Sequence, residues 1–172
     1  MLAWIAFAIP ALGQVSKEEL LPAVTFNLAK YVTWPDTPRA AGDEPFLFIG
    51  VYDSNDWLDA FRGLEDRLIL EKKVRVIQLA DGMDPDDMRR CQVIFTTRAD
   101  VLQKLKPVAQ RGEILLVADV KSAAANEHAS VEFVPKGSRI GFEVSLIFVK
   151  ASNLKISSSV LRLAEKVYKT ED

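Results

Sequence analysis

Four short apolar runs follow one another through the middle of the chain, at residues 46–52, 74–79, 93–97 and 114–118. The run at 46–52 is continuous, which is typical of a strand that is buried on both faces of a sheet. Between the four runs, apolar residues recur at helical spacing, as in Trp57, Leu58, Phe61 and Leu64, or in Val101, Leu102, Leu105 and Val108. This alternation predicts an α/β fold with a mostly parallel sheet of about four strands and helices on both faces.

Polar residues mark where several helices begin. Ser16 and Glu19 form an S-x-x-E capping box, which predicts a helix start at this point. The apolar face of this helix would consist of Leu20, Val24, Leu28 and Tyr31 or Val32, until Trp34-Pro35 ends it. Residues 53–56 can cap a second helix, and Asp100 a third that ends at Gly112.

The last third of the chain has a different pattern. Residues 131–134 and 140–145 read as the two strands of an antiparallel hairpin, with a turn centred on Lys136 and Gly137. After the serines at 157–159 we expect a terminal helix whose inward face is Val160, Leu163, Ala164 and Val167. On its wet side Glu165 would reach Lys169.

The N-terminus has the character of an export signal. Residues 2–12 form an uncharged apolar run of eleven residues, which is too short to span a bilayer but fits a secretory signal. Ala11 and Gly13 are small residues at the positions that a signal peptidase inspects, although no basic residue precedes the run. We therefore predict a signal peptide at 1–13 and a single exported domain at 14–172; the alternative is a buried N-terminal strand or helix.

Composition excludes several classes of function. The chain has 172 residues, 22 Lys and Arg, and 24 Asp and Glu, so its net charge of -2 does not favour nucleic-acid binding. It has one cysteine and one histidine, which argues against a disulfide framework or a zinc or iron site. Cys91 is expected to be a buried thiol and His128 a solvated loop residue. We expect no cofactor, no metal and no catalytic residue.

One candidate site lies where the predicted parallel strands end. Asp53, Thr96, Thr97 and Asp119 follow three of the four strands, and ligands of open α/β sheets bind beyond such strand ends. Two carboxylates and two hydroxyls could hold a cation, a polyol or a peptide amine, and they would repel phosphate. The structural alternative is that the two aspartates cap the following helices and that the threonines bond to loop backbone.

A second candidate region runs from the hairpin to the terminal helix. Arg139 and Glu143 are four residues apart in a strand and face the same side, so Arg139 could pair with Glu143 or across to Glu132. This would be either a solvated charged face or an interface anchored by the arginine. Ser157 and Ser158 add hydroxyls and backbone N–H groups that could receive a partner's carboxylate.

Several segments, in order, resemble the YfiR family of exported regulators. The resemblance covers residues 20–168 and rests on FNLAKYVTWP at 26–35, FIGV at 48–51, CQVIF at 91–95, LLVAD at 115–119, RIGFEV at 139–144 and LKISSSVLRLA at 154–164.

This resemblance implies a non-enzymatic periplasmic repressor of an inner-membrane diguanylate cyclase, which it restrains by binding the cyclase's periplasmic portion. Loss of repression would raise cyclic di-GMP and biofilm formation, and an outer-membrane lipoprotein would sequester the repressor. The resemblance also implies a homodimer and redox control through disulfides. This chain departs from the family pattern in having Cys91 as its one cysteine, Glu127-His128 in place of paired glycines, and Ser145 in place of an asparagine.

Three functions compete at this point. The leading one is a binding protein that acts on a membrane signalling enzyme through Arg139, Glu143 and the start of the terminal helix, with Trp34 and Trp57 as alternative anchors. The second is a periplasmic small-ligand sensor that uses the Asp53–Asp119 crevice and acts on a receptor or histidine kinase. The third, a hydrolase that uses those carboxylates, lacks a nucleophile or metal in the sequence.

Overall fold

The computed structural model describes residues 15–35, 45–120 and 125–169. The helices are α1 (Lys17–Ala29), α2 (Asn55–Arg62), α3 (Pro85–Met88), α4 (Ala99–Gly112), α5 (Ala125–His128), α6 (Leu146–Ala151) and α7 (Ser158–Leu163). The strands are β1 (Val32–Thr33), β2 (Phe46–Val51), β3 (Leu68–Ile69), β4 (Lys72–Gln78), β5 (Val93–Thr96), β6 (Leu115–Ala118), β7 (Val131–Lys136), β8 (Arg139–Ser145), β9 (Lys155–Ile156) and β10 (Lys166–Tyr168).

Most of the strands form one mixed sheet in the order β10-β8-β7-β6-β5-β2-β4-β3, and β1 and β9 form a separate antiparallel pair. Neighbours in the large sheet are parallel except for β3 with β4 and β7 with β8. The α/β class and the mostly parallel sheet are confirmed, but the expected count of about four strands plus a hairpin is wrong. The large sheet has eight strands, because it includes two- and three-residue strands that are too short to show a periodic pattern.

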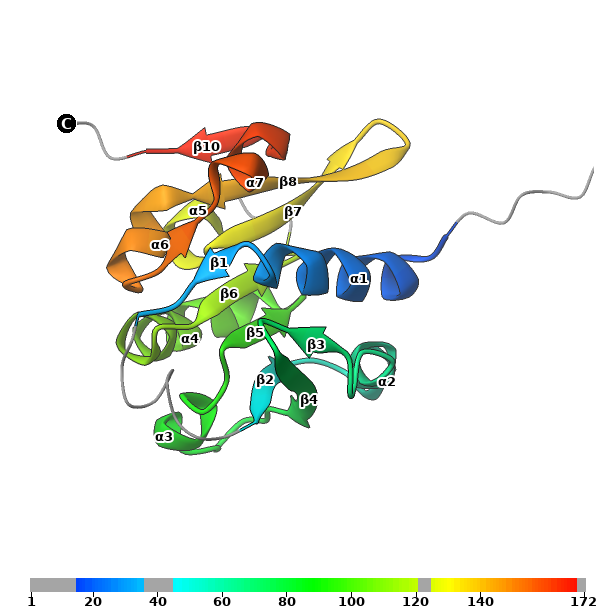
Figure 1. The fold of residues 1–172 in the computed structure, drawn as a ribbon, viewed down its shortest axis with the longest axis vertical. Coiled ribbons are helices and arrows are strands. Elements are labelled where there is room, and N and C mark those ends of the chain that lie inside the picture. Colours follow the sequence, from blue (N-terminus) through cyan, green and yellow to red (C-terminus); the bar gives the residue numbers. More distant parts are fainter. Residues whose placement is uncertain (1–14, 36–44, 121–124, 170–172) are drawn as a thin grey trace, which may run out of the picture.

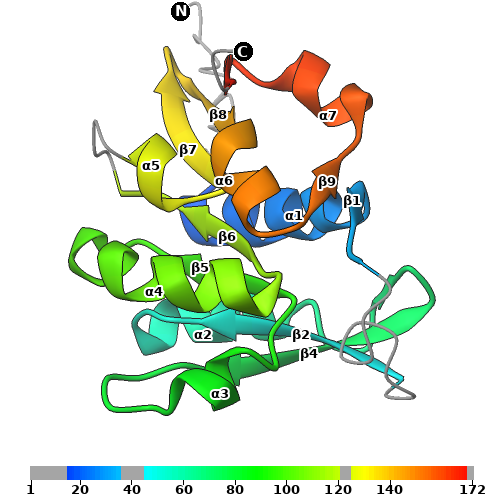
Figure 2. The same cartoon turned by 90° about the vertical axis from the view of Figure 1, so that its left-hand side faces the viewer.

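Helices cover both faces of the sheet. In Figure 2, α4 lies in front of the central strands and α1 behind them, while Figure 1 shows α1 crossing the opposite face. Two buried apolar clusters match these two layers. Val93 and Phe95 of β5 belong to the cluster that includes Leu21 of α1, and Ile94 belongs to the cluster that includes Leu105 of α4. The continuous apolar strands therefore reflect burial on both sides.

The first helix begins as expected and ends earlier. Ser16 and Glu19 make both hydrogen bonds of the capping box, but α1 ends at Ala29, and Val32–Thr33 is a short strand paired with β9. The expected inward face is right in part. Leu28 and Val32 are buried as expected, but Tyr31 is 52% exposed. Helix α1 also buries Leu21, Phe26 and Ala29, which the spacing did not include. Apolar residues lie on most sides of this helix, so helical spacing could not identify the buried side.

The caps expected at the starts of two other helices are wrong. The residue before α2 is Ser54, and the residue before α4 is Arg98; neither side chain caps its helix. Asp100 lies in the first turn of α4 and pairs with Arg98 instead. Helix α4 does end at Gly112, although the left-handed conformation falls on Glu113, with φ 53°.

The C-terminal region differs most from expectation. The hairpin exists, but its strands extend to Lys136 and from Arg139, which moves the turn to Gly137-Ser138. The expected terminal helix stops at Leu163, which is 71% exposed, and the chain continues as β10, parallel to β8. Glu165 therefore does not reach Lys169; its carboxylate pairs with Lys136 Nζ at 2.6 Å. Of the six residues of α7, Val160 is the buried one, so a longer helix would gain little from burial, and the chain pairs with β8 instead.

The sheet ends differently at its two sides. At one side, β3 covers only the start of β4, and Glu65 Oε1 then accepts a hydrogen bond from the backbone N–H of Val76 at 3.3 Å. At the other side, β10 covers β8 from Glu143 to Ser145. The predicted signal peptide at 1–13 lies outside the described residues.

Candidate functional site

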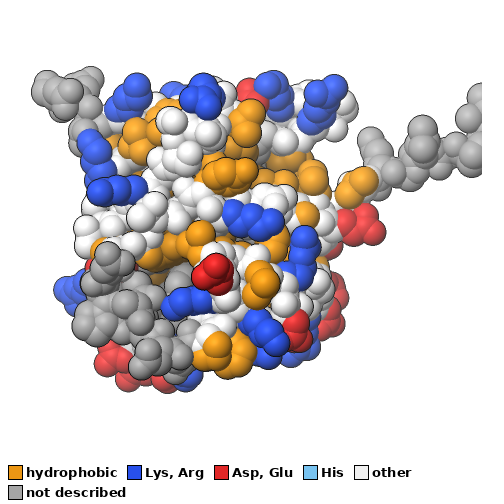
Figure 3. All heavy atoms as spheres, in the orientation of Figure 1, with side chains coloured by type: hydrophobic (Ala, Val, Ile, Leu, Met, Phe, Trp, Pro, Cys, Tyr) orange, Lys and Arg blue, Asp and Glu red, His pale blue; other side chains and the backbone are white. Residues whose placement is uncertain are grey.

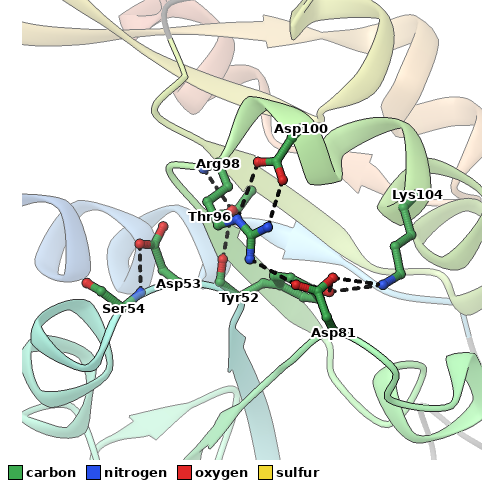
Figure 4. Close-up of polar contacts among 8 residues, drawn as sticks. All are labelled: Tyr52, Asp53, Ser54, Asp81, Thr96, Arg98, Asp100 and Lys104. Carbon is green, nitrogen blue, oxygen red and sulfur yellow. Dashed lines mark hydrogen bonds and ion pairs between the residues drawn. The ribbon is translucent and has the colours of Figure 1, made fainter.

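The sheet reverses its direction of growth between β2 and β5. These two strands are adjacent and parallel, but the chain leaves β2 towards β4 on one side and reaches β6 from β5 on the other. In open α/β sheets this is the position at which ligands bind, just beyond the carboxyl ends of the strands. The structure brings three of the predicted crevice residues together at this switch point: Asp53 is hydrogen-bonded to Thr97, and Figure 4 shows Asp53 beside Thr96.

Both carboxylate oxygens of Asp53 hold loop backbone. Oδ2 accepts a hydrogen bond from the backbone N–H of Thr97 at 2.5 Å, and Oδ1 accepts one from that of Ser54 at 2.8 Å. The buried Thr96 hydroxyl donates to the carbonyl of Tyr52 at 2.9 Å and accepts from the N–H of Arg98 at 3.0 Å. The loops after β2 and β5 are thus tied to each other by side chains that would otherwise be available to a ligand.

Asp119 belongs to the same edge but points elsewhere. Its backbone N–H donates to the carbonyl of Thr96 at 3.1 Å, and its carboxylate, 8% exposed, pairs with Lys17 Nζ at 2.6 Å. Among the described residues, no hydrogen bond or ion pair connects it with the carboxylate of Asp53. Asp119 therefore attaches the start of α1 to the end of β6.

A polar network next to this edge was missed by the sequence reasoning. The buried Tyr52 donates its hydroxyl hydrogen to Asp81 Oδ1 at 2.8 Å and accepts from Lys104 Nζ at 3.1 Å. The guanidinium of Arg98 lies between two carboxylates (Figure 4). Its Nη2 is 2.7 Å from Asp100 Oδ2, and its Nη1 is 3.3 Å from Asp81 Oδ2. Asp81 follows β4 just as Asp53 follows β2, so the rule of strand ends could have identified it.

The network holds its members in their ordinary charge states. The hydrogen bond from Tyr52, followed by those from Lys104 and Arg98, lowers the pKa of Asp81. The hydrogen bond to Tyr52, followed by that to Asp81, raises the pKa of Lys104. Two carboxylates and two cations face one another and balance, so none of these groups is tuned for proton transfer near neutral pH.

The predicted surface residues of the hairpin do not form an ion pair with one another. Arg139 is exposed and lies opposite Lys136, whereas Glu143 lies opposite Glu132. Glu143 Oε2 instead accepts a hydrogen bond from the hydroxyl of Tyr168 on β10 at 2.7 Å, and this bond raises the pKa of Tyr168. Glu143 therefore holds β10 in place, and Arg139 is the accessible member of the predicted pair.

The serines are at the start of α7, next to the small sheet. Ser157 caps the helix through its hydroxyl, which accepts from the N–H of Ser159 at 3.2 Å, and its own N–H donates to the carbonyl of Tyr31 at 3.0 Å. Ser158 is exposed. Of the two tryptophans predicted as alternative anchors, Trp57 is 9% exposed and packs on Phe95 with ring centroids 5.0 Å apart, so it is a core residue and offers no anchor.

Neither a metal centre nor a membrane span is found in the described part of the chain. Over residues 15–35, 45–120 and 125–169, no group of three or more His, Cys, Asp or Glu side chains is placed to hold an ion. Over the same ranges, no helix has the length and apolar character required to cross a bilayer. Cys91 is buried, as expected, and His128 is half-buried.

Comparison with known proteins identifies the family. The family described as DUF4154, YfiR/HmsC-like, matches residues 18–165, which span the fold from α1 to the residues just after α7. No curated protein matches the chain. Proteins of the YfiR/HmsC-like type are periplasmic, non-catalytic regulators of diguanylate cyclase signalling. Since the match covers most of the sequence and almost all of the described fold, the chain belongs to the YfiR/HmsC-like family.

Proposed function

We propose that this protein is exported to the periplasm, where it binds the periplasmic part of an inner-membrane diguanylate cyclase and represses it. The observation that carries this proposal is the family match over residues 18–165. Export is supported by the apolar run at 2–12, with cleavage expected after Gly13. By the same resemblance we propose a homodimer and sequestration by an outer-membrane lipoprotein, with no nucleic-acid partner.

The edge at which an α/β enzyme would hold its reactive groups supports a binding function. Asp53 and Thr96 hold backbone there, and Asp119 pairs with Lys17. Asp81 and Lys104 neutralise each other beside Tyr52. Side chains engaged in this way stabilise a scaffold, and such a scaffold acts through its surface.

For the partner-binding surface we propose the hairpin end and the start of α7. Arg139 and Ser158 are exposed and can contact a partner directly, while Glu143 and Ser157 position β10 and α7. An arginine at the centre of such a surface supplies planar, charge-assisted hydrogen bonds to a carboxylate. The cyclase segment that binds here is therefore expected to carry acidic residues.

The test is the level of cyclic di-GMP in cells that lack the gene, measured by mass spectrometry. We expect the level to rise on deletion, to return to normal with the wild-type protein, and to stay high with Arg139→Glu. The matched control is Arg111→Glu, an exposed arginine on α4, which should restore repression. An unchanged level on deletion contradicts the cyclase-repressor function, and full repression by Arg139→Glu contradicts the proposed surface.

A second candidate function, a small-ligand sensor that acts on a receptor or histidine kinase, is favoured by one observation. A cavity of about 340 Å³ lies at the amino-terminal edge of the sheet and is lined by residues of β1, the start of β2 and the turn before β4. This volume is within the range of small-molecule sites. The crevice at Asp53, Thr96, Thr97 and Asp119 remains the other predicted location for such a ligand.

A further inference from the structure

The cavity at the amino-terminal edge combines an apolar floor with an unusual set of polar groups. Its apolar lining comes from Val32, Trp34, Leu47 and the exposed Leu70, and Tyr31 stands at its side. Figure 3 views the same side of the molecule as Figure 1 and shows apolar side chains interspersed with basic and acidic side chains across the middle of this face. A ligand with an apolar body would bury that body against this floor.

The polar groups of the cavity are mostly hydrogen-bond donors. The indole N–H of Trp34 is buried and has no acceptor among the described residues. Gln92 uses its carbonyl oxygen to accept from the N–H of Phe48 at 2.7 Å, which leaves its NH₂ group to donate. Lys30 adds an ammonium group. A buried donor without an acceptor is costly, so a ligand that accepts its hydrogen bond is favoured.

The charge of the residues that line the cavity also favours an anion. No Asp or Glu is among the described residues that line the cavity, whereas Lys30 is. Lys30 Nζ lies 4.3 Å from the ring centroid of Phe26 and 3.4 Å from Asn27 Oδ1, so its side chain is held by neutral partners, and its charge remains available to an anion. We infer that this cavity binds a small organic anion with an apolar body, whose acidic group accepts hydrogen bonds from Trp34 and Lys30.

The turn that borders the cavity has an unfavourable backbone. Leu70 and Glu71 are the two residues between β3 and β4, and both have positive φ, at 48° and 66°. Two-residue hairpin turns of this kind normally use Asn and Gly, because other side chains cost free energy in the left-handed region. Leu70 is nevertheless present and 56% exposed. An apolar side chain in a strained, exposed position is explained if it covers a ligand.

The cavity is connected to the surface proposed for partner binding. Strand β1, which lines it, pairs with β9 through Val32 and Ile156, and the carbonyl of Tyr31 accepts from the N–H of Ser157 at the start of α7. A bound anion that fixes Tyr31 and Trp34 would also fix this start of α7. Ligand control of repression by this route rests on the proposed function, whereas binding itself does not.

Binding is tested on the purified protein by isothermal titration calorimetry with octanoate, and with octanol and octylamine as matched neutral and cationic probes. A charge-assisted hydrogen bond contributes about 1.5–3 kcal/mol, so octanoate should bind at least about tenfold more tightly than either control probe. No heat with octanoate at millimolar concentration, or equal binding of the three probes, would overturn the inference.

Variants then locate the site. Lys30→Gln and Trp34→Phe should each weaken octanoate binding about tenfold, whereas Arg111→Gln on α4 should leave it unchanged. Leu70→Gly suits a φ of 48° and should keep the fold intact while weakening binding about threefold. Unchanged affinity in both Lys30→Gln and Trp34→Phe would show that octanoate binds elsewhere. These measurements use no cyclase, so they can fail or succeed independently of the proposed repression.

Discussion

Replacement of Asp53 distinguishes a structural carboxylate from a ligand-binding one. In Asp53→Ala, the backbone N–H groups of Thr97 and Ser54 lose their acceptors, at 2.5 and 2.8 Å. Hydrogen bonds to a charged acceptor contribute about 1.5–3 kcal/mol each when buried. Asp53 is half-buried and water can replace part of this, so we expect a loss of about 2–3 kcal/mol in the free energy of unfolding.

The assay is urea denaturation followed by tryptophan fluorescence, with thermal unfolding as a second measurement. A loss of this size lowers the Tm of a domain of this length by about 4–12 °C. Asp53→Asn keeps one acceptor oxygen, so its loss in the free energy of unfolding should be about half that of Asp53→Ala. The matched control is Asp59→Ala on α2, where a carboxylate 69% exposed pairs with Arg62 and should change stability by less than about 0.5 kcal/mol. If Asp53→Ala unfolds like the wild type, the carboxylate does not hold the loops together, and its assignment to a ligand crevice gains support.

Three further predictions concern the polar network, the last strand and the core. Hydrogen bonds from Tyr52, Lys104 and Arg98 lower the pKa of Asp81 from 3.8, so the ionised carboxylate stabilises the folded state at higher pH. The stability advantage of the wild type over Asp81→Asn should therefore disappear as the pH falls below 3.8. An advantage that persists in acid would contradict this. Tyr168→Phe removes the hydrogen bond to Glu143, so it should cost about 1 kcal/mol and speed amide exchange in β10 without changing that of β2. Gly50→Ala would place a Cβ 2.7 Å from Leu79 Cδ1, so overpacking should lower the free energy of unfolding by about 1–3 kcal/mol, as measured by chemical denaturation. An unchanged free energy of unfolding would mean that the Leu79 side chain moves aside at little cost.

The centre of the fold could be predicted from the sequence because β5 and β6 are buried on both faces, while β4 is buried through Val74 and Val76 in an alternating pattern. The apolar runs that become β2, β4, β5 and β6 stand out without any knowledge of their neighbours. The short strands β3, β9 and β10 could not be predicted, since two or three residues carry no period. The terminal helix was overextended because Val167 fits a helical spacing as well as a strand, and only its pairing with Val144 decides between them.

The candidate site was predicted in part. The rule that ligands bind beyond strand ends led to the edge at which Asp53 and Thr97 share a hydrogen bond, and ligand binding there stays a prediction. It did not predict that loop N–H groups would occupy the Asp53 carboxylate, because such bonds depend on the exact path of the loops. The cavity beside Trp34 and Leu70 could not be predicted from the sequence, because it is formed by segments that meet only in the folded chain.

The way in which the large sheet ends limits how two copies of this chain can associate. Glu65 occupies the edge N–H of Val76, and β10 covers the end of β8. A second molecule that continues the sheet along these two stretches must therefore first displace Glu65 or β10. We expect a homodimer of this chain to form through helix surfaces or the hairpin end, and mutations that expose either margin to promote aggregation instead.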